Sequence, residues 1–341
     1  MVMFWFTILA ASILLYVLLD GFDLGVGLLF GTIRNEARRR DMLAAVDPVW
    51  DGNETWLVSG GTILWGAFPL VFATLLSAFY LPVLVMLAGL ILRGVAFVYL
   101  GKAQRTRWLW VAAFAGGSLA AAFMQGLMVG ALVNGLPISN GQYTGGDFGW
   151  LHPFAIFCGL SLCVGYALLG ACWLVKKCEG ETRDSAYDMI PYLAIVLLVL
   201  LAVVFFHALF GDLRIMDRWL ERPYLFVFPV IGIAAALAAT LSVRRRRDGV
   251  PFMMGLIIFA AAFGTFAISF WPYMIPFSIT VVEAASPHSS LAFMFWGAGL
   301  FVFPLMLIYT AISYTVFRGK LKSTVVILDC DVHASAVDGS K

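Results

Sequence analysis

Long apolar runs recur along the whole chain and constrain its fold more than any other feature. About 20 mostly apolar residues are enough to cross a bilayer, and on this criterion we predict nine crossings, at residues 4–32, 55–76, 78–100, 109–133, 151–175, 190–210, 224–242, 251–272 and 291–317. Charged residues make up 12% of the chain, whereas they make up about 25% of an ordinary soluble domain. The sequence therefore predicts an all-α integral membrane protein.

The connections between the apolar runs are too short for a soluble domain. The longest polar ones are residues 134–149 and 211–223. In the second, Arg214, Arg218 and Arg222 recur every four residues, a pattern typical of a short interfacial helix with a solvated charged face. We expect one transmembrane domain over 1–322 and a cytoplasmic tail over 323–341.

Basic residues gather on alternate connections, which predicts the orientation of the chain. One side carries eighteen Lys and Arg residues, at 34–40, 102–107, 176–183, 244–247 and 318–341, and the other side carries three, at 214–222. Because such residues accumulate on the cytoplasmic side, we place the amino terminus outside and the carboxyl terminus in the cytoplasm.

Several classes of function find no support in the composition. A formal net charge of +2, with the basic residues dispersed over short connections, argues against a nucleic-acid partner. The five cysteines include no CxxC pair and no two of the four histidines are four residues apart, so the spacing proposes no metal site. It neither proposes nor excludes a haem held by two histidines.

Two carboxylates, Asp20 and Asp23, interrupt the first apolar run. A charge at the bilayer centre costs about 2.5–3.5 kcal/mol on insertion scales, so it normally faces protein or water. Three positions apart, the two share one face of a helix. Gly21 and Gly25 form a small-xxx-small pair on another face, where a second helix can approach closely. We predict a proton path through the two aspartates; the alternative is that they only hydrogen-bond to a neighbouring helix.

A second acidic pair, Asp51 and Glu54, lies in the segment WDGNETW at the cytoplasmic start of the second run. Its spacing is that of a helix capping box, and Trp50 and Trp56 suit the membrane interface. The functional interpretation is that Asp51 and Glu54 form the mouth of a path whose interior sites are Asp23 and Asp20. The two interpretations are compatible.

Other polar residues within the apolar runs need partners. Because the second and third runs are joined near Ser77, Arg93 should return toward Asp51 and Glu54 and pair there as a counter-charge, with snorkelling to the interface as the alternative. We expect Gln125 to hydrogen-bond between helices and His207 to be a packing residue. The segment 270–290, broken by prolines, is either a loop facing lipid or quinone or an exit turn.

Taken together, a set of short segments resembles subunit II of the cytochrome bd-type quinol oxidases, and most closely their cyanide-insensitive branch. The segments are DGFDLGVG, WDGNETW, LRGVAF, MQGLMVG, NGLPI, FWPYMIPFSIT and YTAISYTVFRGK, and the resemblance runs from residue 1 to about 322. It implies a first four-helix bundle over 1–135, a second over 150–272, and a peripheral final helix over 290–318.

The resemblance also implies a function. The family's complex oxidises quinol and reduces dioxygen to water with protons taken from the cytoplasm, in the bacterial cytoplasmic membrane. A similarly folded partner, subunit I, carries haems b558, b595 and d, so no catalytic residue is expected in this chain. Quinone, lipids and a small single-helix subunit are further candidate partners.

By motif position, the family's proton-path residues correspond to Asp23 and Asp51, with Asp20 and Glu54 as weaker additions. Val98 and Leu100 stand where many relatives have an acidic and a basic residue, so any role of those positions is in doubt here. The main alternative is a proton-coupled secondary transporter, which should show paired repeats and discontinuous helices; neither is evident in the sequence. A third hypothesis is a purely architectural subunit.

The predicted orientation can be tested with single cysteines. A membrane-impermeant thiol reagent should label Gly145→Cys in intact cells, because that connection is expected outside. The same reagent should label Gly249→Cys only after lysis, with the unsubstituted chain as the background. The reverse pattern would overturn the assigned orientation.

Overall fold

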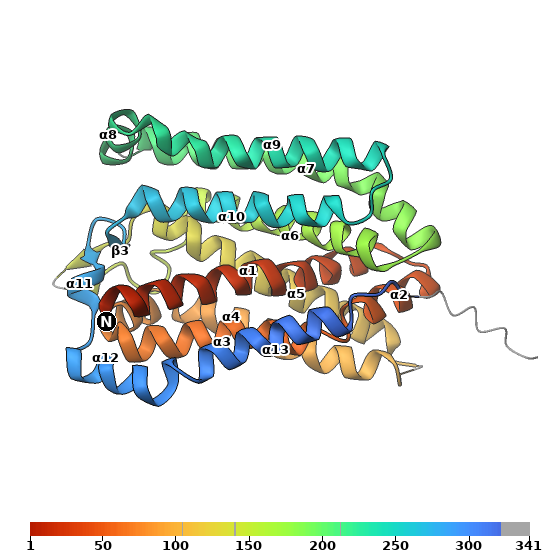
Figure 1. Cartoon of the computed structure of the whole chain (residues 1–341), viewed down its shortest axis with the longest axis horizontal. Helices are drawn as coiled ribbons and strands as arrows, with labels where there is room; N and C mark the ends of the chain where they lie inside the picture. The colour runs from red at the N-terminus through yellow and green to blue at the C-terminus, as the bar shows by residue number, and fades with distance from the viewer. Residues whose placement is uncertain (104, 140, 212, 322–341) are drawn as a thin grey trace, which may run out of the picture.

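The long helices lie side by side along one direction in the computed structural model, which describes residues 1–103, 105–139, 141–211 and 213–321 (Figure 1). They are α1 (Val2–Thr32), α3 (Trp50–Ala67), α4 (Pro69–Leu100), α5 (Arg107–Asn134), α6 (Pro153–Lys177), α7 (Gly180–Gly211), α9 (Val227–Arg244), α10 (Val250–Phe270) and a final segment made of α12 (His288–Met294), the π-helical turn η2 (Phe295–Gly299) and α13 (Val302–Val316). The predicted all-α fold is confirmed. The tail 323–341 lies outside the described residues.

Short elements connect these helices. They are α2 (Glu36–Val46), α8 (Leu213–Glu221), the 3-10 turn η1 (Pro223–Phe226), α11 (Val281–Ala284), and two antiparallel strand pairs, β1 (Ile138–Ser139) with β2 (Gln142–Tyr143) and β3 (Tyr273–Ile275) with β4 (Ile279–Thr280).

Within the described residues, eight helical segments are long and apolar enough to cross a membrane. The ninth long helix, α3, has 18 residues, which corresponds to about 27 Å, close to the thickness of the hydrocarbon core. It falls outside the group of eight and carries the acidic residues of WDGNETW in its first turns. The chain starts at one end of the helix array and α13 finishes at the other (Figure 1).

The turn between the second and third apolar runs differs from the prediction. It lies at Phe68 and not near Ser77, because Pro69 begins α4. Proline fits the first turn of a helix but disfavours helical geometry in the residue before it, and Phe68 has φ −134° and ψ 57°. Ser77 lies inside α4, which bends two residues later at Phe79, near the internal Pro82.

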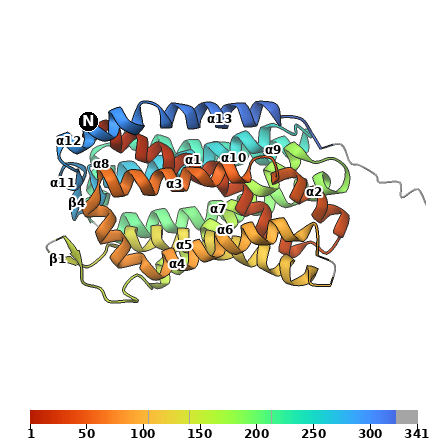
Figure 2. The ribbon, with the colours of Figure 1, turned by 90° about the horizontal axis from the view of Figure 1, so that it is seen from below.

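The helices pack as two groups of four joined through α1, α5 and α6. In the first group α1 contacts α3 and α5, and α5 contacts α4; in the second, α6 contacts α7 and α10, and α9 contacts α7 and α10. The groups meet where α6 packs on α1 and α5. The final helix α13 lies along one side, without a buried residue (Figure 2). This is the predicted arrangement; residues 1–135 and 150–272 stay as proposed limits of the two bundles.

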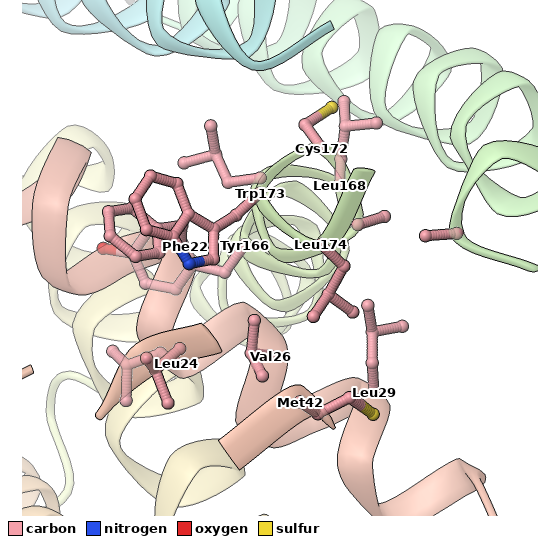
Figure 3. Close-up of a cluster of buried hydrophobic side chains, with 14 of the residues drawn as sticks. Phe22, Leu24, Val26, Leu29, Met42, Tyr166, Leu168, Cys172, Trp173 and Leu174 are labelled. Atoms are coloured by element: carbon pink, nitrogen blue, oxygen red, sulfur yellow. The ribbon is translucent and has the colours of Figure 1, made fainter. Parts of the chain in front are cut away.

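Backbone contact between α1 and α6 joins the two groups. A Cβ atom on Gly25 would overlap the carbonyl oxygen of Tyr166 and lie 2.9 Å from the nitrogen of Gly170, so the small-xxx-small prediction is confirmed. One turn away Phe22 stacks on Trp173, with ring centroids 4.2 Å apart (Figure 3). Side chains of this interface belong to the main hydrophobic cluster of the molecule.

We call one end of the array the basic end. It contains α2, the α6–α7 and α9–α10 connections and the residues after α13. Thr182 donates to Asp41 of α2 (2.8 Å). In the α9–α10 connection Asp248 accepts from Tyr187 and Lys320. Burial opposes ionisation of Asp248, but these hydrogen bonds outweigh it and lower its pKa. Lys177 donates to the carbonyl of Phe317, so the chain after α13 is fixed to α6.

At the opposite end, α8 is the predicted short helix, and its charged face is solvated at Asp217 and Glu221, with Arg218 half-buried. Trp219 of this helix is fully buried. Arg218 donates to the carbonyl oxygens of Ile268 (3.2 Å) and Ser269 (3.1 Å), because the end of α10 exposes carbonyls that lack a helical partner. Arg222 is exposed, and the side chain of Arg214 lies outside the described part.

The segment 270–290 turns through β3, β4 and α11 at the same end. Thr280 and Glu283 form a capping box at the start of α11, and the hydrogen bonds from Thr280 lower the pKa of Glu283.

A single methyl group should disturb the contact between α1 and α6. Gly25→Ala places an atom against a backbone that cannot move aside, so we expect a loss of about 1–3 kcal/mol and a clearly lower melting temperature in detergent. Gly116→Ala is the matched control, because a Cβ there meets nothing within 4 Å. Equal melting temperatures for the two variants would contradict the proposed contact.

Candidate functional site

The acidic stretch of α1 lies in the protein interior. Every residue from Asp20 to Gly27 is buried, and both carboxylates are fully inaccessible. Helix α1 contacts α3, α5 and α6, so protein surrounds this stretch. The sequence-based expectation that the two aspartates face the protein interior is confirmed.

Asp20 forms an ion pair with Arg93 of α4. Arg93 Nη1 lies 3.0 Å from Asp20 Oδ1, and both side chains are buried. The predicted pairing of Arg93 with Asp51 or Glu54 is therefore wrong. Helix α4 packs mainly on α5 and touches α3 little, so Arg93 meets α1 across the bundle interior. Its burial also excludes snorkelling.

Asp23 is bound by an uncharged amide. Asn53 Nδ2 donates to Asp23 Oδ2 (2.7 Å) and to the carbonyl oxygen of Leu19 (3.2 Å). Asn53 is 1% exposed, although it lies between two acids near the start of α3. Sequence reasoning missed this residue; the available signal was a polar side chain three positions before Trp56, on one face of the helix.

The acids of WDGNETW lie on the same turns of α3 as Asn53. Asp51 is exposed and Glu54 is half-buried, and within the described residues no hydrogen bond joins either one to Asp23. The predicted capping box is absent there, because α3 begins at Trp50, with Val49 at the cap position.

The two tryptophans of this segment differ in position. Trp50 is half-buried. Trp56 is fully buried against Phe303, so the interfacial position predicted for it is wrong.

A second polar layer lies beside the ion pair. Gln125 of α5 donates to Tyr16 Oη (2.7 Å) and accepts from Tyr166 Oη (2.8 Å). The predicted interhelical role of Gln125 is confirmed, and it connects α1, α5 and α6. Tyr16 is one helical turn before Asp20, so the aromatic hydroxyls and the charged groups occupy neighbouring levels of the bundle.

The described histidines do not form a buried pair that would hold a haem. His207 is exposed and stacks on Phe154, with centroids 4.0 Å apart, as expected for a packing residue. His288 is exposed and His152 half-buried, while His333 lies outside the described residues. Among residues 1–321, apart from the three undescribed positions, no three His, Cys, Asp or Glu side chains form a group that could hold a metal ion.

The fold and the buried cluster define a polytopic helical membrane protein with ionisable side chains in its interior. The family model for cytochrome bd terminal oxidase subunit II matches residues 1–317. The chain therefore belongs to this family of subunits of a respiratory oxidase.

Curated relatives agree with this assignment. The chain is 28% identical to the cytochrome bd-I ubiquinol oxidase subunit 2 of Escherichia coli (strain K12), over 93% of this chain and 94% of the relative. It is 29% identical to the cytochrome bd ubiquinol oxidase subunit 2 of Bacillus subtilis (strain 168), over 93% and 96%. Membership favours the oxidase subunit over the secondary transporter; the cyanide-insensitive branch stays a prediction.

The fold itself also has a solved counterpart. A chain of the bd oxidase from Geobacillus thermodenitrificans superimposes with a TM-score of 0.77, over 93% of this chain and 97% of that chain. At 16% identity, this similarity supports the fold alone.

The ion pair predicts a strong dependence of assembly on Arg93. Arg93→Met leaves Asp20 buried without its counter-charge, which should cost about 3–5 kcal/mol and reduce the yield of folded protein. Adding Asp20→Leu should restore much of that yield, because an apolar pair can replace a buried ion pair. Arg107→Met is the control, since its partially exposed pair with Glu36 should be worth about 1 kcal/mol or less. Failure of Arg93→Met to reduce the yield would contradict this account.

Proposed function

We propose that this chain supports a haem-bearing partner subunit in a bd-type quinol oxidase and provides part of a path that carries protons from the cytoplasm. The complex would couple quinol oxidation to the reduction of dioxygen to water. Family membership supports the assignment to the oxidase. The proton path is proposed from the buried cluster of α1, α3 and α4.

The observation that carries the proposal is an imbalance of buried charge. Two carboxyl groups, Asp20 and Asp23, share the interior with one guanidinium, Arg93, which contacts Asp20. The cluster is electrically neutral when one carboxyl group carries a proton, and an uncompensated charge is costly in this environment. Asp23 accepts its one hydrogen bond among the described residues from the Asn53 amide, and it is the group that we expect to take up and release the proton.

The route to Asp23 begins at Asp51. The first turns of α3 carry exposed Asp51, half-buried Glu54 and buried Asn53, and Asn53 lies next to Asp23. Asp23 lies nine residues before the end of α1, which is about 14 Å from the basic end. We propose that the basic end faces the cytoplasm, so that protons enter at Asp51 and reach Asp23 past Glu54.

The partner subunit would supply the redox chemistry. We propose that subunit I carries haems b558, b595 and d, where dioxygen is reduced, together with the quinol-oxidising loop. This chain would then be a non-catalytic subunit of the oxidase. Lipids, quinone and a small single-helix subunit stay as proposed further partners.

Removing the proton-carrying carboxyl group should slow the complex without changing its cofactors. Asp23→Asn should reduce oxygen consumption at saturating quinol by roughly tenfold or more, and Asp51→Asn should reduce it by less, because water can also deliver protons at an exposed site. The reduced-minus-oxidised haem spectrum should be unchanged.

Asp147→Asn is the control, since Asp147 is exposed at the opposite end of the bundle. Full turnover in both Asp23→Asn and Asp51→Asn would reject the proton path and favour a purely architectural subunit. Purification in mild detergent without a haem-bearing chain would reject the assignment of the partner.

A further inference from the structure

Helix α13 reaches the buried carboxyl group of Asp23 through a single amide. Tyr314 Oη of α13 donates to Asn53 Oδ1 (2.9 Å), and Asn53 Nδ2 donates to Asp23 Oδ2 (2.7 Å). The hydrogen bonds therefore run from α13 through α3 to α1. This connection is notable because α13 has no buried residue of its own.

The orientation of the Asn53 amide follows from its neighbours. The carbonyl oxygen of Leu19, 3.2 Å from Asn53 Nδ2, can only accept a hydrogen bond, so the nitrogen must face it. The amide oxygen then faces Tyr314, whose hydroxyl must donate. A reversed amide would bring its oxygen toward Leu19 O and Asp23 Oδ2, two acceptors. Tyr314 thus stabilises the one orientation in which Asn53 donates to Asp23.

This arrangement distinguishes the two oxygens of the Asp23 carboxyl group. Oδ2 accepts from the amide, and Oδ1 is buried without a hydrogen-bond partner among the described residues. A proton taken up by Asp23 therefore goes to Oδ1, while the amide continues to donate to Oδ2. When the proton leaves, the amide hydrogen bond is what stabilises the resulting negative charge.

We propose that Tyr314 is a positioning residue for the proton-carrying carboxyl group of Asp23 and acts through Asn53. The proposal rests on the proposed function of Asp23. The charged groups that face Asp23 are Asp20 on its own helix, Arg93 on α4 and Glu54 on α3. Tyr314 lies on a fourth helix, is uncharged, and acts on Asp23 through its hydrogen bond to Asn53.

Ring contacts of Tyr314 and hydrogen bonds just beyond α13 hold the tyrosine in place. The Tyr314 ring lies edge-on to Phe22 and to Trp173, with centroids 6.5 Å and 6.1 Å away. Just beyond α13, Lys177 donates to the carbonyls of Phe317 and Gly319. The helix therefore has a fixed register against the bundle, even though its outer face is exposed.

The proposal can be tested by infrared difference spectroscopy on the intact oxidase complex. The C=O band of protonated Asp23 is first identified by its loss in Asp23→Asn. In Tyr314→Phe the ring remains but the hydroxyl is absent, so the amide is no longer held in place. Losing one ordinary hydrogen bond changes an equilibrium by about five-fold, or about 0.7 of a pH unit. We expect the band to shift in frequency and to persist to a higher pH by about this amount.

A double-mutant cycle tests the route through Asn53. Asn53→Leu should change the band at least as much as Tyr314→Phe, and adding Tyr314→Phe to Asn53→Leu should change nothing more. Tyr309→Phe is the matched control, because Tyr309 is an exposed tyrosine of the same helix. The haem spectrum reports whether each complex assembles.

The outcomes separate this proposal from the proposed function. An unchanged band in Tyr314→Phe, an equal change in Tyr309→Phe, an additive double variant, or no band that depends on Asp23 would each overturn the role of Tyr314. Turnover of Asp23→Asn decides the proton path independently. If the band shifts in Tyr314→Phe while Asp23→Asn and Asp51→Asn both keep full turnover, the positioning role of Tyr314 is retained and the proton path is rejected.

Discussion

Contact between the backbones of α1 and α6 is the interaction on which the rest of the structure depends. At Gly25 the two helices approach so closely that a methyl group has no room, and this contact joins the two four-helix groups. It also places α1 in the middle of the molecule, with α3 and α5 on its other sides. A helix in this position has no lipid-facing surface along Asp20 to Gly27, and this is why it can carry two carboxyl groups across a membrane.

The two carboxyl groups of α1 have different partners in the protein interior. Asp20 has a full counter-charge in Arg93, 3.0 Å away, and we regard this pair as structural. Asp23, one helical turn away, accepts its hydrogen bond from the uncharged amide of Asn53 and has no direct ion pair among the described residues. A pair of similar groups with different partners is a common basis for dividing structural and proton-transfer roles. The proposed function assigns the transfer to Asp23 for this reason.

The helices and the family could be predicted from the sequence, because hydropathy and short motifs are local properties. The turn at Phe68 was missed because mostly apolar residues continue past Pro69 to Ser77, so hydropathy gives no boundary. The partner of Arg93 was missed for a different reason: spacing along the chain does not tell which helices are neighbours. Asn53 and Tyr314 are 261 positions apart, and only the packing of α13 brings them together.

The place of Tyr314 near the end of the chain has a consequence for biogenesis. Helices enter a membrane in the order in which they are synthesised, and among the described helices the acidic helix α1 comes first and α13 comes last. The hydrogen bonds at Asp23 are therefore complete only after the final helix has inserted and Lys177 has bound the carbonyls that follow it. A chain synthesised only as far as α10 already contains both aspartates and Arg93, yet it lacks the tyrosine that orients the amide, so the site can mature only after α13 has been made.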